Sequence, residues 1–284
     1  MTATTSPFFK ELDYLGHRWN AQADRPIAEM GFYRRAHLLA ELSFASYWAE
    51  EYMRELCDHF GFQELRHFSF QGAHAYVIGN EHDSIVACRG TEAGDWNDIR
   101  ATLKIWKATA TTIGKVHSGF NAEVDHLWPE LEEALQSNTR PLYFTGHSLG
   151  GAMALICAGR SELGGSATPP QEIQTFGCPR VGNHRYITHC MLRKIRWVNN
   201  NDFATRLPPA IIGFRHSGLE MYIDGRGNIS GLTGMRRLGR RLASFTRGLT
   251  RARIDHFSDH LMPGYIAPIL RAARVESLQG TVPV

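Results

Sequence analysis

A strand–turn–helix pattern around Ser148 constrains the fold of this 284-residue chain more than any other feature. The apolar run Leu142–Thr145 is rich in residues that favour β-strands. It leads directly into Gly-His-Ser-Leu-Gly-Gly at 146–151, where the first and fifth residues are glycines that let two backbone segments approach closely. Small apolar residues over 151–159 then suit a buried helix. The pattern predicts a strand, a sharp turn that presents Ser148, and a helix packed against a sheet.

The rest of the chain alternates between strand-like and helix-like segments. Apolar residues recur at helical spacing over 30–60 and 121–135, and β-forming runs bounded by turn residues occupy 65–70, 73–78, 84–88, 173–176 and 195–198. Strands that alternate with helices predict an α/β protein with a sheet covered by helices on both faces. Because we see no internal repeat and no long linker, we expect one domain over 1–284. A loosely held N-terminal arm is expected over 1–25 and a basic amphipathic insertion over 232–253.

Composition is that of an ordinary globular protein, with 43% hydrophobic and 21% charged residues and a net charge of +3. That charge is too small to indicate nucleic acid by itself. The five cysteines are widely spaced and odd in number, which predicts buried free thiols rather than a disulfide scaffold or a zinc ribbon. The N-terminal residues lack the features of a signal peptide, and no run reaches the length of a membrane span. We therefore expect a cytoplasmic protein, although export by a route without such a signal stays open.

The glycine-flanked Ser148 has the pattern of a nucleophile elbow, in which a strained turn presents a serine hydroxyl to a base. The N–H of Leu149, at the start of the helix, is then a candidate donor to a developing oxyanion. The alternative is a glycine-rich turn whose serine has no chemical role, and it leaves the apolar strand before the turn unexplained. In hydrolases with this elbow the acid and the histidine follow the serine in the chain. Asp202, in a polar loop after the strand-like run 195–198, is the candidate acid, with a turn-forming aspartate as the alternative.

Two Asp-His pairs are candidates for the base, Asp255-His256 and Asp259-His260. The two histidines are four residues apart and also fit a metal-binding helix face, but no third ligand cluster accompanies them, so we predict no metal. His216 also follows the serine, in a segment that we predict to be a hairpin. Local pattern does not decide between His256 and His260.

Several motifs, in the right order, resemble the class 3 or fungal-type triacylglycerol lipases of the α/β-hydrolase superfamily. The segments that carry the resemblance are Cys88–Thr91 with Asp95–Asp98, Val116–Phe120, Gly146–Ala152, Thr175–Asn183, Asn201–Asp202 with Arg206–Pro209, and Asp259–His260 with Tyr265. Together they extend over roughly residues 85 to 270. The resemblance implies an α/β-hydrolase fold with a central, mostly parallel sheet.

The resemblance also implies roles for individual residues. His260, five residues before Tyr265, takes the family's catalytic position, and Asp202 and Ser148 complete a triad. Thr91 becomes the second oxyanion donor beside Leu149, and no metal or organic cofactor is needed. The implied activity is lipase or esterase hydrolysis of carboxylic esters, on acylglycerol-like lipids or short acyl esters, through an acyl-enzyme.

This sequence departs from the family where the fungal enzymes have an apolar lid helix. Its residues there are Glu92–Asp95, a polar segment that contains a glycine and forms a poor surface for binding oil. We therefore expect weak interfacial activation and smaller or more dispersed esters as substrates.

A basic segment, Arg236–Arg253, contains seven arginines and no acidic residue, with apolar residues at helical spacing. The pattern predicts an amphipathic helix that makes peripheral contact with an anionic membrane, and a core-packed helix with a solvated arginine face is the alternative. Contact with phospholipid makes phospholipase A1-type activity an alternative function, and a non-catalytic lipid-binding scaffold is an alternative of another class. Gly225–Gly227 resembles the start of a nucleotide-binding loop but lacks its third glycine, so we predict a hairpin turn there.

Overall fold

An eight-stranded sheet forms the centre of the computed structural model, which describes residues 17–90, 106–164, 167–232 and 258–279. The strands, in spatial order, are β1 (Glu64–Phe70), β2 (Ala73–Gly79), β3 (Ser84–Cys88), β6 (Leu142–His147), β7 (Pro170–Phe176), β8 (Arg193–Asn199), β9 (Leu219–Ile223) and β10 (Ile229–Leu232). The five strands from β3 to β9 pair in parallel, and the pairings β1–β2, β2–β3 and β9–β10 are antiparallel. The predicted α/β class with a mostly parallel sheet is confirmed.

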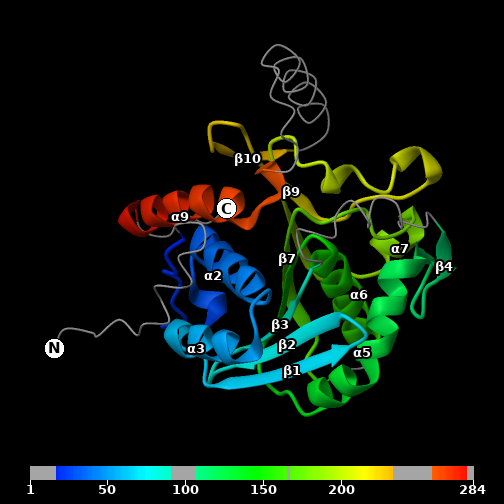
Figure 1. Ribbon diagram of the computed structural model, residues 1–284, viewed down its shortest axis with the longest axis horizontal. Coiled ribbons are helices and arrows are strands. Elements are labelled where there is room, and N and C mark those ends of the chain that lie inside the picture. The colour runs from blue at the N-terminus through cyan, green and yellow to red at the C-terminus, as the bar shows by residue number, and fades with distance from the viewer. Residues whose placement is uncertain (1–16, 91–105, 165–166, 233–257, 280–284) are drawn as a thin grey trace.

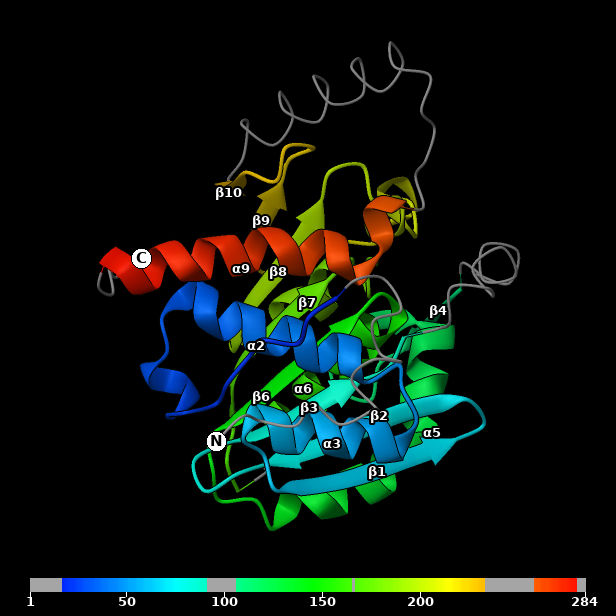
Figure 2. The same cartoon turned by 60° about the vertical axis from the view of Figure 1, so that its left-hand side comes forward.

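Helices cover both faces of this sheet (Figure 1). Helices α5 (Ser118–Gln136) and α6 (Leu149–Leu163) pack on one face, and α2 (Phe32–Ala45), α3 (Glu50–Phe60) and α9 (Met262–Gln279) pack on the other (Figure 2). A second, two-stranded sheet pairs β4 (Lys107–Thr109) with β5 (Lys115–His117), and the short helix α7 (His184–Thr188) follows β7. Four short 3-10 helices complete the described elements: η1 (Ile27–Glu29), η3 (Ala204–Arg206), η4 (Ala210–Ile212) and η5 (Ser258–His260), with η5 leading into α9.

The two-sided cover explains why the central strands are continuously apolar. Side chains along a strand point alternately to opposite faces. Val86 and Phe144 therefore pack with residues of α5 and α6, whereas their neighbours Ile85 and Tyr143 pack with residues of α2 and α3. Since both faces are covered, all residues of β3 and β6 are buried.

Within the described residues, the structure confirms the helices and strands that the sequence pattern predicts, with ends that move by a few residues. The turn at Gly225–Gly227 is also confirmed: it joins the antiparallel strands β9 and β10, and the N–H of Gly227 donates to the carbonyl of Asp224 at 2.7 Å. The hairpin predicted around His216 is wrong. His216 lies in the loop before β9, where its Nε2 is 2.7 Å from the carbonyl oxygen of Thr205. Its neighbour Arg215 forms an isolated β-bridge with Gly182, which is not part of a hairpin.

The chain before α2 is anchored to the domain, so the loosely held arm expected over 1–25 is wrong for 17–25. The carboxylate of Glu41, buried in α2, accepts the backbone N–H groups of Asn20 and Ala21 at 3.0 and 2.7 Å. Trp19 is buried and stacks on Phe44. The mixed composition of 17–25 hides this packing because its partners lie 20 or more residues further along the chain. Residues 1–16 lie outside the described residues, and so does the predicted basic insertion apart from Leu232, the last residue of β10.

All five cysteines are buried and free, which confirms the prediction made from their spacing. Among the helices that the structure describes, none has the length and apolar character to cross a membrane.

Candidate active site

Ser148 lies in a strained turn between the end of β6 and the start of α6. Its φ of 58° and ψ of −128° fall in a region that residues with a side chain rarely adopt. Two hydrogen bonds hold this conformation: the N–H of Ser148 donates to the carbonyl of Phe176 at 2.9 Å, and its own carbonyl accepts the N–H of Gly151 at 3.0 Å. Such strain persists only where the surroundings fix the backbone. The turn therefore has the conformation that a nucleophile elbow requires.

The glycines beside Ser148 allow this turn to form. A Cβ atom at Gly146 would lie 2.3 Å from the carbonyl oxygen of Gly150, and one at Gly150 would lie 2.2 Å from that of Cys88. Both contacts are backbone contacts that cannot relax easily. The elbow is thus packed against the end of β3, the strand whose chain continues toward Thr91.

Asp202 and His260 meet in a buried contact at the same edge of the sheet. Asp202 lies in the loop that follows β8, and His260 ends the 3-10 helix η5. The Nδ1 atom of His260 is 2.8 Å from Oδ2 of Asp202, whose other oxygen accepts the N–H of Ala204 at 2.9 Å. The hydroxyl of Tyr265, in α9, donates to the same Oδ2 atom. Because a carboxylate oxygen accepts this hydrogen bond, Nδ1 of His260 is its donor, and Nε2 is the ring atom left to take a proton.

Further hydrogen bonds join the loop of Asp202 to the loop of His260. The side chain of Asp259 accepts from Nδ2 of Asn200 at 3.0 Å and from the N–H of Asn201 at 3.2 Å. The side-chain amide of Asn199 donates to the carbonyl of Asp259 at 2.9 Å. The two loops are therefore held together by bonds that do not involve the Asp202–His260 contact itself.

Gly177, directly after β7, lies against this contact. Its φ is +60°, and a Cβ atom there would lie 2.8 Å from Oδ2 of Asp202 and 3.0 Å from Cε1 of His260. The ends of β6, β7 and β8 thus bring Ser148, Gly177 and Asp202 to one edge of the sheet. In open α/β sheets the carboxyl ends of parallel strands are where ligands bind.

Burial sets the protonation of two groups around this edge. Burial, with the negative charge of Asp202, raises the pKa of Tyr265 well above its ordinary value, so its hydroxyl stays a donor to the carboxylate. Burial also lowers the pKa of His147, the residue before Ser148, well below its ordinary value and keeps that ring neutral. Ser148 itself is buried, and its hydroxyl has no hydrogen-bond partner among the residues that the structure describes.

The structure therefore brings Ser148, Asp202 and His260 to one region, with Leu149 as the first residue of α6. The first N–H groups of a helix have no carbonyl partner within that helix, so the N–H of Leu149 is suited to donate to a ligand. Thr91, the predicted second donor, lies outside the described residues. So do Asp255 and His256, the competing pair for the base.

Sequence reasoning missed two residues that contact this region, Tyr47 and His147. The Nδ1 atom of His147 is 2.8 Å from the hydroxyl of Tyr47, and its Nε2 atom is 2.8 Å from the carbonyl oxygen of His260. His147 lies inside the elbow motif, and this position could have marked it as a residue of the site. Tyr47 lies 100 residues earlier, and no local pattern marks it.

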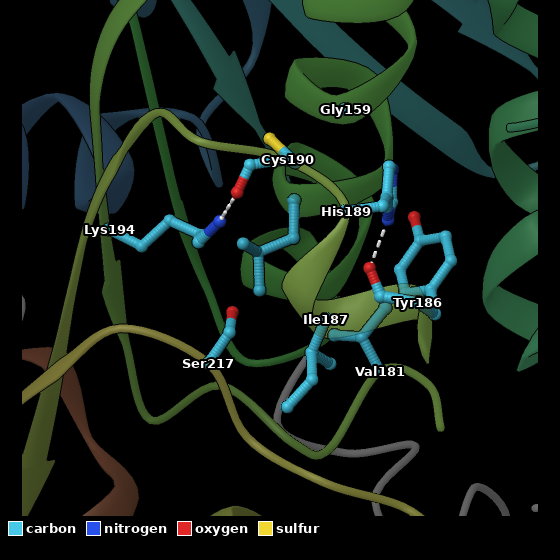
Figure 3. Close-up of a pocket in the computed structure, with 9 residues that line it drawn as sticks. Gly159, Val181, Tyr186, Ile187, His189, Cys190, Lys194 and Ser217 are labelled. Carbon is cyan, nitrogen blue, oxygen red and sulfur yellow. Dashed lines mark hydrogen bonds between the residues drawn. The ribbon is translucent and has the colours of Figure 1, made fainter. Parts of the chain in front are cut away.

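A separate pocket lies beside the middle of α6, and none of the predicted site residues lines it (Figure 3). Within it Lys194 donates to the carbonyl of Cys190, and the ring of His189 is bonded to the carbonyl of Tyr186. Among the described residues, the His, Cys, Asp and Glu side chains do not form a group of three suited to hold a metal ion.

Comparison with known proteins finds a family match over part of the chain: residues 85–211 match the model of class 3 lipases. Secreted mono- and diacylglycerol lipase 1 of Fusarium solani is 32% identical over 118 residues, which are 39% of this chain and 34% of that protein. A lipase of Rhizomucor miehei is 38% identical over 121 residues, 38% of this chain and 33% of that protein. Phospholipase A1-IIdelta of Arabidopsis thaliana is 34% identical over 88 residues, 29% of this chain and 21% of that protein. The chain thus spans about a third or less of the length of these relatives.

Solved structures extend the likeness in fold. The Rhizomucor miehei lipase–propeptide complex is similar with a TM-score of 0.59 and 26% identity, over 69% of this chain and 70% of that one. A mutant form of MDLA from Penicillium cyclopium is similar with a TM-score of 0.62 and 20% identity, over 82% of this chain and 95% of that one. These similarities, with the mostly parallel sheet, show the α/β-hydrolase fold.

The cytoplasmic location expected from the sequence is contradicted by these comparisons, because the relatives from Fusarium solani and Penicillium cyclopium are named secreted. That expectation rested on the N-terminal residues and on the unpaired cysteines. Burial protects a thiol from oxidants in any compartment, so five buried free cysteines do not identify one.

Proposed function

We propose that this chain, which belongs over residues 85–211 to the class 3 lipase family of the α/β-hydrolase superfamily, hydrolyses carboxylic esters of lipids through an acyl-enzyme on Ser148. The observation that carries the proposal is the buried 2.8 Å contact between His260 and Asp202 at the sheet edge where the strained elbow holds Ser148. A serine hydroxyl is a weak nucleophile until a base takes its proton, and this arrangement supports such a base beside it.

In the proposed reaction, Nε2 of His260 takes the proton of Ser148 as the serine oxygen attacks the ester carbonyl. Asp202 orients the imidazole through Nδ1 and stabilises the imidazolium that forms. The backbone N–H groups of Leu149 and Thr91 donate to the oxyanion of the tetrahedral intermediate. His260 then gives the proton to the leaving alcohol. Water, deprotonated by the same histidine, attacks the acyl-enzyme, and the carboxylic acid leaves as Ser148 regains its proton.

Hydrolysis of p-nitrophenyl esters with acyl chains from two to sixteen carbons tests this proposal. The Ser148→Ala variant should lose turnover by about 10³-fold or more, because removal of the nucleophile leaves only the residual catalysis of binding and the oxyanion site. Ser137→Ala is the matched control, since Ser137 is an exposed residue directly after α5 whose hydroxyl donates to the carbonyl of Ala134. Turnover in Ser148→Ala equal to that of the control would refute the proposal.

The proposed preference among ester substrates rests on residues 92–95, which lie outside the described residues. The polar stretch Glu92–Asp95 favours short or dispersed esters over bulk oil, so we propose a preference for the shorter acyl chains and a small gain in rate at an oil interface. A profile that rises steadily to sixteen carbons and increases sharply above the solubility limit of the ester would contradict this preference.

Phospholipase A1-type hydrolysis is the second candidate, favoured by the Arabidopsis relative of that name and by the arginines of 236–253. We propose that this basic segment makes peripheral contact with anionic membranes. Co-sedimentation with phosphatidylglycerol and phosphatidylcholine vesicles, with fatty-acid release measured in the same tubes, tests both ideas. Stronger binding to the anionic vesicles that is lost when Arg240 and Arg241 become Gln supports the contact, and equal binding to both vesicles opposes it. A non-catalytic lipid-binding scaffold is the outcome if lipid binds while no ester is hydrolysed.

A further inference from the structure

His147 connects the nucleophile elbow to the loop that carries His260. It directly precedes Ser148 in the chain, and its buried ring lies 4.5 Å, between centroids, from the ring of His260. Its Nε2 atom is 2.8 Å from the backbone carbonyl oxygen of His260, and its Nδ1 atom is 2.8 Å from the hydroxyl of Tyr47. Both ring nitrogens are therefore used, and rotation of the ring in either direction breaks a hydrogen bond.

The partners of His147 determine which nitrogen carries the proton. A carbonyl oxygen only accepts, so Nε2 donates to His260, and Nδ1 accepts from the O–H of Tyr47. Since burial keeps the pKa of His147 far below its ordinary value, the ring stays neutral and holds this tautomer. Tyr47 thus fixes the tautomer that allows His147 to hold the backbone of His260.

Tyr47 also contacts the segment that leads into Thr91. It lies just after the last residue of α2, and a Cβ atom on Gly90 would fall 2.2 Å from its hydroxyl oxygen and 2.6 Å from the carbonyl oxygen of His147. Only a glycine fits at position 90 while these groups stay in place. Tyr47 and His147 together therefore contact the elbow, the end of the β3 segment and the histidine loop.

We propose that Tyr47 and His147 are a positioning pair that fixes the backbone of His260 relative to Ser148. This inference rests on the proposed function, because it assigns the pair to the same reaction. His147 and Ser148 are adjacent in the chain. A hydrogen bond from His147 to the carbonyl of His260 therefore fixes the position of the base relative to the nucleophile. Proton transfer depends on that position far more than substrate binding does, so loss of the bond lowers kcat and leaves KM nearly unchanged.

Two amide substitutions separate this role from simple packing. In His147→Gln the amide nitrogen reaches the place of Nε2 and keeps a donor toward the carbonyl of His260, whereas in His147→Asn the shorter amide reaches only the place of Nδ1. We expect His147→Gln to keep kcat within about 10-fold of the wild type, the range of one altered neutral hydrogen bond. His147→Asn should lose about 10²-fold in kcat, the effect of a misplacement of about 1 Å, with KM unchanged in both. Equal kcat values in the two variants, or a loss that falls on KM alone, would overturn the proposal.

Tyr47→Phe tests the pair from its other end and is needed if His147→Asn does not fold. The substitution keeps the aromatic ring and removes only the donor to Nδ1 of His147. We expect kcat to fall about 3- to 10-fold with KM unchanged. An unchanged kcat would overturn the positioning role of Tyr47. His189→Asn is the control, because the ring of His189 is also bonded to a backbone carbonyl, here through Nδ1, but lies in the separate pocket of Figure 3, away from this site. It should change neither constant.

A fluorophosphonate, which reacts with an activated serine, distinguishes failure of this inference from failure of the proposed function. If the wild type is labelled at Ser148 but the Gln and Asn variants have equal kcat, only the positioning role is overturned. If the wild type neither reacts with the reagent nor hydrolyses any ester, the proposed function fails first and the positioning role fails with it.

Discussion

Substitution of Gly177 by alanine is a sharp test of the Asp202–His260 contact, because the added methyl group enters that contact directly. The new Cβ atom would lie 2.8 Å from Oδ2 of Asp202 and 3.0 Å from Cε1 of His260, both closer than van der Waals contact. The carboxylate has little freedom to move away, since it also accepts from Tyr265 and from the N–H of Ala204. We therefore expect His260 to be displaced, by an amount on the order of 1 Å, and kcat to fall by about 10²-fold.

The same substitution also strains the backbone, and this effect must be measured separately. At the φ of +60° of Gly177 an alanine costs about 1–2 kcal/mol, which corresponds to a fall in Tm of roughly 2–8 °C for a chain of this size. Gly72→Ala is a matched control, because Gly72 has a φ of +91° with no other atom within 4 Å of the added Cβ. Both variants should lose stability, measured by thermal unfolding, and only Gly177→Ala should lose ester turnover. Equal kcat values in the two variants would refute the reasoning.

Two further predictions concern carboxylates. Asp202→Asn should lower kcat by about 10⁴-fold, because an amide nitrogen cannot accept from Nδ1 of His260 and the histidine then takes the wrong tautomer. Steady-state ester hydrolysis measures this change, and a loss below 10-fold would contradict the prediction. Glu41→Gln should reduce acid sensitivity: burial by itself raises the pKa of Glu41, but hydrogen bonds from His17 and His37 outweigh it and bring the pKa to about 2, below the usual 4.5. A lowered pKa stabilises the fold above pH 4.5, and the contribution of about 3 kcal/mol is lost as pH falls from 4.5 toward 2. Urea unfolding at several pH values should show this loss in the wild type and a flatter profile in Glu41→Gln, and identical profiles would contradict it.

Most of the fold was predictable because its signals are local. The buried runs that became β3 and β6 are short, apolar and bounded by turn residues, and the glycines at 146 and 150 mark the turn between β6 and α6. The anchoring of 17–25 was missed because its main partner, Glu41, lies in a helix whose amphipathic pattern explains that residue only as polar. Burial of a polar residue depends on what the rest of the chain brings to it, and periodicity does not report that.

The residues of the candidate site also differ in how far local sequence predicts their positions. Ser148 and Asp202 follow strands, so the order of elements was enough to propose that they meet at one edge of the sheet. His260 does not directly follow any strand that the structure describes, and residue pattern alone does not distinguish it from His256. In the structure, contacts from distant parts of the chain hold the loop of His260: Asn199, Asn200 and Asn201 bind Asp259, and His147 binds the carbonyl of His260.

This difference also predicts where the site is most sensitive to substitution. Ser148 directly follows β6 and Asp202 lies in the loop directly after β8, and both strands are paired with neighbours on each side, so loss of one strand hydrogen bond leaves the others in place. The position of His260 instead depends on a few side-chain bonds and on the packing of α9 that follows it. A site whose nucleophile and acid are held by a sheet, and whose base is held by side chains, should lose activity through displacement of the base before its fold is lost. The Gln and Asn variants of His147 are the direct test, because they change one of those few side-chain bonds and, although His147 ends β6, they keep its backbone pairing with Phe176.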